Sequence, residues 1–121
     1  MVAMLFVSFK FYAQSHKMDW KEMHDFHEIV SITFHSAEGD LFNPLKENTH
    51  VLIEKAEAWK NSAIPAGYEA KATKKALGNL VKECKKVDKM VKSNKPDAAL
   101  MAGITKVHDV FHGIMEMGGK H

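Results

Sequence analysis

Arginine is absent from this sequence, and all 17 basic residues are lysines. The planar guanidinium group that grips phosphates and base edges in two places at once is therefore missing. The 15 acidic residues nearly cancel the lysines, which leaves a formal net charge of +2. No basic run carries interleaved aromatic residues, so we expect no nucleic-acid partner.

Cysteine is almost absent too, since Cys84 is the single one. It can form no disulfide within the chain, and a lone cysteine at a helix-interior position is most simply core packing. No run alternates as a β-strand does, and we find no glycine-rich phosphate loop, paired catalytic carboxylates or nucleophile–base arrangement. The sequence therefore predicts no enzyme.

Long apolar runs are confined to the N-terminus, where residues 1–13 read MVAMLFVSFKFYA. The run is shorter than the roughly 20 residues of a membrane-spanning helix. It ends on a small residue, Ala13, as an export signal does, although a basic start is lacking and Lys10 interrupts it. We interpret residues 1–13 as a truncated signal peptide and residues 14–121 as one exported, periplasmic domain without a stable membrane span. An apolar strand or a short membrane anchor is the alternative.

Apolar residues recur at helical spacing in four blocks, at about 18–37, 43–61, 69–93 and 97–117. In the first block, Asp19 is the expected N-cap, with Glu22 completing a capping box. Gly39 is expected to end that helix in the left-handed conformation. The core stripe of this block is predicted to be Trp20, Met23, His27, Val30, Phe34, Ala37 and Leu41. Short connections between the blocks predict an all-α fold, an antiparallel up-down-up-down four-helix bundle.

Eight histidines are more than a core of this size needs, and four of them form two pairs at helical spacing. When the ends of the first and last helices are aligned, His27 lies opposite His108 and His24 lies opposite His112. A single histidine on an apolar face is usually a hydrogen-bonded core residue, but two pairs at one level favour a metal site. Imidazoles suit zinc, copper, iron or nickel. We therefore predict an ion bound by these four histidines, for binding, storage or sensing.

Other residues near this level are candidates for extra ligands or for orienting the imidazoles. Glu28 and Asp109 each follow a core histidine and are equally well explained as surface charges. Met23 and Cys84 bring sulfur to the predicted core, where packing is the simpler reading. A second, weaker ion site is predicted near the connection between the first two helices, from His35, Glu38, Asp40, Glu47 and His50.

The segment Ile104 to His112 resembles the haem-attachment helix of the cytochrome c-prime family. That family carries Cys-x-x-Cys-His near the end of the last helix of a four-helix bundle, followed by an acidic residue and an aromatic. Here Ile104 and Val107 stand at the cysteine positions, so covalent attachment is excluded, while His108 stands at the axial position. The related b-type cytochrome implies non-covalent haem b, with Met23 or His27 as the second axial ligand and electron transfer or gas binding as the function.

Two further interpretations stay open. The chain resembles ferritin-like di-iron proteins in its helix order, and Glu47 with His50 matches their Glu-x-x-His spacing. Its near match, Asp109 with His112, falls about 13 Å away along the bundle, so the two half-sites miss each other. A metal-free interaction or scaffold bundle is the alternative from a different class, and the sequence is compatible with a homodimer.

Overall fold

The computed structural model describes residues 20–118, which contain four α-helices and no β-strand. They are α2 (Lys21–Glu38), α3 (Asn43–Lys60), α4 (Ala70–Lys92) and α5 (Asp97–Met117). The predicted all-α class with four helices is confirmed, and every helix end falls within three residues of its predicted position.

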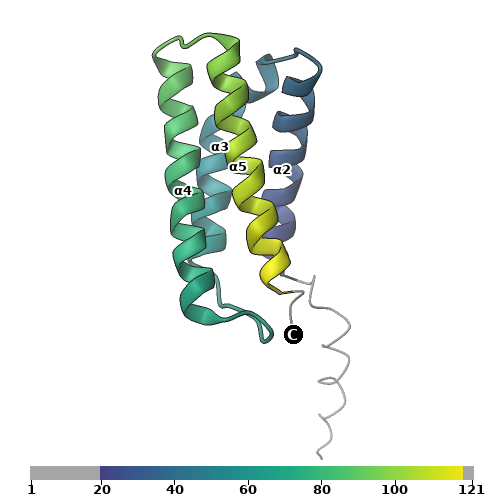
Figure 1. Ribbon diagram of the computed structural model, residues 1–121, viewed down its shortest axis with the longest axis vertical. Helices are drawn as coiled ribbons and strands as arrows, with labels where there is room; N and C mark the ends of the chain where they lie inside the picture. The colour runs from purple at the N-terminus through teal and green to yellow at the C-terminus, as the bar shows by residue number, and fades with distance from the viewer. Residues whose placement is uncertain (1–19, 119–121) are drawn as a thin grey trace, which may run out of the picture.

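Each helix packs against two others: α2 and α4 both contact α3 and α5. The connections from α2 to α3 and from α4 to α5 lie at one end of the bundle, and the connection from α3 to α4 lies at the other (Figure 1). No helix within residues 20–118 is both long and apolar enough to cross a membrane. The predicted export segment, residues 1–13, lies outside the described part of the chain.

Two helices end in the same hydrogen-bonded turn, and neither uses glycine for it. Asp40 and Asn94 take the left-handed conformation, with φ of 65° and 58°. Beyond Asp40, the Leu41 N–H donates to the Ser36 carbonyl over 2.9 Å, which satisfies a carbonyl of the last turn. The prediction that Gly39 takes this conformation is wrong, because Gly39 has φ of −92° and the turn falls one residue later.

The start of α2 also differs from its prediction. Trp20 occupies the N-cap position and makes no side-chain cap hydrogen bond, while Asp19 lies outside the described residues. The first turn of α4 has a real side-chain cap, because the Glu69 carboxylate accepts from the backbone N–H of Ala72 over 2.8 Å.

Aromatic side chains fill the core near the end where α3 connects to α4. Trp20 lies edge-on to Trp59, with ring centroids 5.6 Å apart, and to Tyr68 at 4.9 Å. Phe26 contacts Trp59 at 5.8 Å and Phe111 at 5.9 Å. Such pairs contribute about 0.5–1.5 kcal/mol each beyond the area that they bury. This cluster joins α2, α3 and α5 and fixes how they are placed relative to one another.

The predicted core stripe of α2 needs one correction at its end. Leu41 is 65% exposed, whereas its neighbour Phe42 is 8% exposed and belongs to the core. The left-handed turn at Asp40 redirects the chain, so the helical period no longer decides which side chain points inward.

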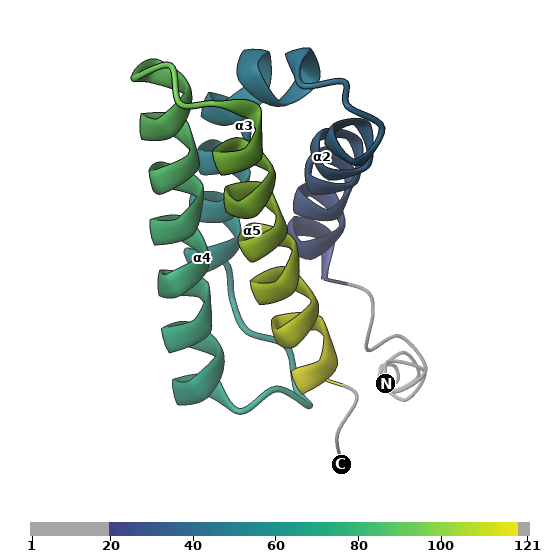
Figure 2. The same ribbon diagram turned by 45° about the horizontal axis from the view of Figure 1, so that its top comes forward.

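A kink interrupts α3 at Asn48, whose φ of −126° and ψ of 18° are not helical. Figure 2 shows the first turns of α3 bent over the end of the bundle. Directly after the kink, the buried Thr49 donates a 2.6 Å hydrogen bond to the Asp88 carboxylate of α4. Lys92 pairs with the same carboxylate at 2.8 Å. Asp88 therefore ties the kinked helix to α4.

Gly103 is buried where α5 packs against α4. A Cβ atom at this position would lie 3.0 Å from the Val87 side chain and 3.1 Å from the Met90 sulfur. At Gly113 of the same helix, a Cβ atom would meet nothing within 4 Å.

Substituting these two glycines by alanine should therefore separate helix propensity from packing. Gly113→Ala is expected to raise the free energy of unfolding by about 0.5–1 kcal/mol, because alanine favours the helix. Gly103→Ala should be at least about 1 kcal/mol less stable than Gly113→Ala, since the added methyl group overpacks the contact between the helices. Urea unfolding of both variants checks this, and equal gains in stability would contradict the close approach.

Asp88→Asn should weaken the tie between α3 and α4. Its hydrogen bonds with Lys92 and Thr49 lower the pKa of the Asp88 carboxyl. The carboxylate therefore stabilises the fold above the ordinary aspartate pKa of about 3.9, and this stabilisation is lost as pH falls through the lower folded-state value. We expect Asp88→Asn to cost about 1–2 kcal/mol at pH 7. Urea titrations at a series of pH values check this. The difference in the free energy of unfolding between Asp88→Asn and the natural chain should become smaller in acid.

Asp25→Asn is the matched control, because Asp25 pairs with Lys21 at 2.8 Å on the exposed surface of α2. An exposed pair of this kind contributes little to stability. If Asp25→Asn and Asp88→Asn had the same effect at every pH, the proposed role of Asp88 would be wrong.

Candidate metal centre

The aromatic contacts between α2 and α5 set which histidines face one another. Phe26 of α2 lies against Phe111 of α5, and Phe34 of α2 is stacked on His108 at 4.0 Å with an interplanar angle of 12°. His108 therefore lies opposite Phe34, two helical turns beyond the predicted partner His27. The predicted pairing is wrong in register because it aligned the helix ends, whereas packing of the rings fixes the register.

His27 does not belong to the core stripe of α2, and this prediction is wrong. Its side chain is exposed, while the neighbouring Phe26 is fully buried. The imidazole of His27 lies over the ring of Phe111, with centroids 5.1 Å apart and an angle of 22°. His24 is exposed one turn earlier on α2. The structure therefore leaves both histidines of the predicted α2 pair on the surface, with His27 beside α5.

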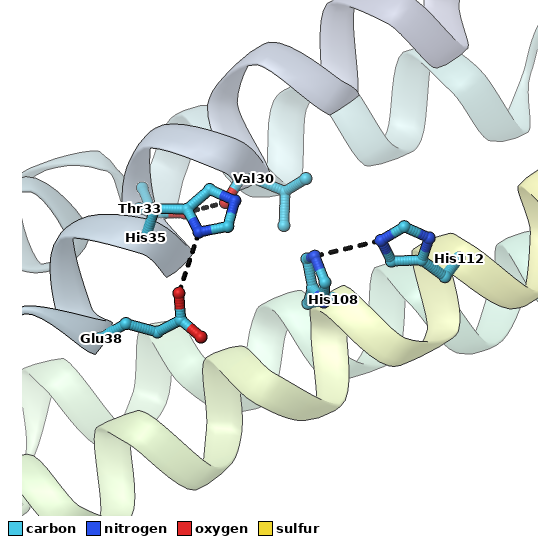
Figure 3. A network of polar contacts seen from close by, with 6 residues as sticks. All are labelled: Val30, Thr33, His35, Glu38, His108 and His112. Atoms are coloured by element: carbon cyan, nitrogen blue, oxygen red, sulfur yellow. Dashed lines mark hydrogen bonds and ion pairs between the residues drawn. The ribbon is translucent and has the colours of Figure 1, made fainter.

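The pair on α5 is arranged as the sequence predicts, because residues four apart share one helix face. The Nε2 atoms of His108 and His112 point toward one another and lie 3.2 Å apart (Figure 3). Both side chains are half-buried. Burial, followed by the neighbouring imidazole of His112, lowers the pKa of His108. His108 thus stays neutral, and able to act as a ligand, to a lower pH than a free histidine.

A third imidazole approaches this pair from α2. The ring centroid of His35 lies 6.2 Å from that of His108. Nδ1 of His35 is 2.9 Å from the Glu38 carboxylate, one turn further along α2 (Figure 3). In the neutral tautomer in which Nδ1–H donates a hydrogen bond to Glu38, the free lone pair of His35 is on Nε2. This pattern, in which a carboxylate orients a histidine, recurs around metal ligands.

Sequence reasoning assigned His35 and Glu38 to a separate second site, and the structure places them beside His108 instead. A signal was present, because His27, Ser31 and His35 are four residues apart and form one stripe on α2. The other members of the predicted second site are not gathered with them. Asp40 lies in the turn after α2, Glu47 is exposed on α3, and His50 is close enough to Asp88 of α4 to affect its pKa.

The predicted sulfur ligands lie away from the histidines. Met23 is buried near the start of α2, where its sulfur accepts a 3.9 Å hydrogen bond from the Tyr68 hydroxyl. Cys84 is fully buried in α4, and burial raises the pKa of its thiol to about 12. A thiol with this pKa stays protonated and is a poor ligand. Glu28 and Asp109 are exposed next to His27 and His108.

The residues present do not fit a haem held by His108 together with Met23. Met23 and Phe34, which marks the level of His108, are eleven residues apart on α2, about 16 Å along its axis. If His108 were an axial ligand, the iron would bind in front of its Nε2 atom. That space holds the imidazole of His112. His27 is no better placed, since its ring is stacked on Phe111.

Within residues 20–118, no three histidine, cysteine or acidic side chains already stand close enough to surround one ion. The pair on α5 is a preformed two-nitrogen arrangement, and a third ligand has to come from a side chain that moves. His35 is the candidate for this, because its side chain is 63% exposed.

The chain was compared with protein-family models, with curated proteins and with solved structures, and none of them matches. The likeness of Ile104 to His112 to the cytochrome c-prime family therefore stays a prediction. What the site can do follows from the imidazoles on α2 and α5.

Proposed function

We propose that this protein binds a divalent transition-metal ion on the face between α2 and α5. His108 and His112 are the central ligands, and His35, oriented by Glu38, is the third. The observation that carries the proposal is the 3.2 Å separation of the two Nε2 atoms on α5. Two nitrogens bound at about 2.0–2.1 Å to one tetrahedral ion lie about 3.3 Å apart, so the separation of this pair already matches that of two ligands on one ion.

Metal binding also accounts for the way these two imidazoles face each other. In the metal-free state, one neutral ring can donate to the other, but two protonated rings at this distance repel. A cation beside the line that joins the two Nε2 atoms can accept both lone pairs at once, after the rings turn toward it. The lowered pKa of His108 favours the neutral form that a metal requires.

The position of the site favours reversible binding. His108 and His112 are half-buried, His35 is exposed, and none of the three is among the buried core residues. Three protein ligands leave a tetrahedral ion one open position for water or for a donor from another molecule. We therefore propose binding, storage or sensing of zinc, copper or nickel, with a fold that stands without the ion.

The predicted bundle topology belongs to this proposal, because ligands from α2 and α5 must meet at one level. Antiparallel order is supported by contacts that run in opposite directions along the two helices. Phe26 contacts Phe111, whereas Phe34, later on α2, contacts the earlier residue His108. Export to the periplasm stays a prediction from residues 1–13.

Titration of the untagged, metal-free protein with Zn²⁺, Cu²⁺ and Ni²⁺ tests the ligand set. Loss of a residue that only orients a metal ligand costs about 10–100-fold in metal affinity. His108 and His112 are proposed as direct ligands, so His108→Ala and His112→Ala should each lower the affinity at least about 100-fold. His35→Ala should weaken binding about tenfold or more. His24→Ala is the matched control, because it removes an exposed α2 histidine outside the cluster, and its affinity should be unchanged.

Unchanged affinity in both α5 variants would overturn the proposal, and so would an equally large loss in His24→Ala. Absence of stoichiometric binding in the natural chain would instead favour the metal-free interaction bundle. Thermal unfolding provides a second readout, because an ion at 100 times its Kd adds about 2.7 kcal/mol to the folded state. This gain should disappear in His108→Ala.

The titration of His108 in the metal-free protein is a separate prediction. We expect its imidazole, followed by NMR, to protonate at a lower pH in the folded protein than in the urea-unfolded chain. His112→Asn should move the His108 pKa upward, because it removes the neighbouring imidazole that lowers it. Since the folded-state pKa lies below the unfolded value of about 6.5, His108 makes the fold less stable as pH falls from 6.5 through the folded-state pKa. Identical titration curves for His108 in the folded and the unfolded chain would contradict the burial of His108.

A further inference from the structure

The outer surface of α4 is a continuous face of lysines. They recur at helical spacing and fall within about 120° of the helix circumference, at 100° per residue. All eight are exposed. We call this the lysine face; its members are Lys71, Lys74, Lys75, Lys82, Lys85, Lys86, Lys89 and Lys92.

The charge of the molecule is concentrated on this helix. α4 holds eight lysines and two acidic residues, Glu83 and Asp88, which is a net charge of +6. The whole chain carries +2, so the remainder carries −4. Such a separation gives the molecule one strongly positive side, although its overall charge is small.

Few carboxylates neutralise the lysine face. Within residues 20–118, three of its lysines each form one ion pair: Lys85 with Glu57 at 3.5 Å, Lys86 with Glu83 at 3.5 Å and Lys92 with Asp88 at 2.8 Å. The other five lysines form no ion pair with a described residue. The face spans about 32 Å along a helix that has no internal kink.

We propose that the lysine face docks the protein on a bilayer that contains anionic phospholipids. A bilayer is flat and densely charged, so a straight helix can bring all of its lysines to the surface at once. Each lysine close to such a surface strengthens adsorption about fivefold. The face carries no exposed aromatic or large apolar side chain, so it adsorbs by charge without inserting.

Other polyanions fit this face less well. Protein interfaces draw their affinity from tyrosine, tryptophan and arginine and are depleted in lysine. A duplex is convex and is gripped best by arginine forks, which this chain lacks. Adsorption to a plane of anionic lipid headgroups requires only that many cations lie on the same side of the protein.

Docking through α4 leaves the proposed metal centre open to solvent. α4 packs against α3 and α5 and makes no contact with α2, so the helix that carries His35 lies diagonally across the bundle (Figure 1). The two proposals are independent, because the lysine face uses no histidine.

Co-sedimentation of the full chain with vesicles tests the docking surface, with a chelator present to remove metal ions. The protein should bind phosphatidylcholine vesicles that contain phosphatidylglycerol, and the binding should weaken steeply as salt is raised. Vesicles of pure phosphatidylcholine are the control for binding through the apolar residues 1–13, because such binding does not depend on lipid charge. The triple variant Lys75→Gln, Lys82→Gln and Lys89→Gln should bind the anionic vesicles about 100-fold more weakly.

The matched control is the triple variant Lys21→Gln, Lys46→Gln and Lys106→Gln, which removes the same charge from the other three helices. Its affinity for the anionic vesicles should be within a few-fold of that of the natural chain. Equal losses in the two triple variants would overturn the proposal, because net charge alone would then explain adsorption. Failure of the natural chain to bind anionic vesicles at low salt would overturn it too. Tighter binding to a DNA duplex than to the vesicles would identify a nucleic-acid surface instead and reject the bilayer.

Discussion

Ring packing between α2 and α5 is the contact on which the candidate site depends. Phe26 against Phe111 and Phe34 against His108 fix the relative positions of the first and last described helices. The same contacts half-bury His108, lower its pKa and leave its Nε2 facing His112. A shift of one turn between these helices would separate His35 from His108, so the arrangement of the imidazoles follows from the aromatic core.

Helix bounds could be predicted from the sequence because they rest on local signals. Proline and polar residues between the apolar blocks mark where the helices begin and end, and all the predicted helix ends lie within three residues of the observed ones. The register between α2 and α5 could not be predicted in this way, since it depends on which rings interlock. His27 and Phe26 are neighbours in the sequence, and only packing decides that Phe26 turns inward.

The candidate site was predictable in part for the same reason. His108 and His112 are four residues apart on one helix, so their pairing is a local property that the spacing reveals. The position of α2 relative to this pair is a long-range property: the sequence predicted His27 opposite His108, whereas the structure brings His35 beside it. Glu38 pairs with His35 within one turn, but the approach of His35 to His108 depends on the packing of the whole bundle.

A chemical division of the bundle follows from the two proposals. Imidazoles gather on the face between α2 and α5, whereas lysines cover the outer face of α4. The first arrangement suits a small cation and the second an extended anionic surface. The core between them is apolar and closed by aromatic rings, so it holds both faces in place without taking part in either kind of binding.

A crystal structure of the protein loaded with Zn²⁺, with anomalous data collected at the zinc edge, tests the central claim most directly. The account predicts one strong anomalous peak at about 2.0–2.1 Å from Nε2 of both His108 and His112, with His35 rotated to bind the same ion. A fully occupied peak at His24 or His50, with none between the two imidazoles of α5, would contradict it.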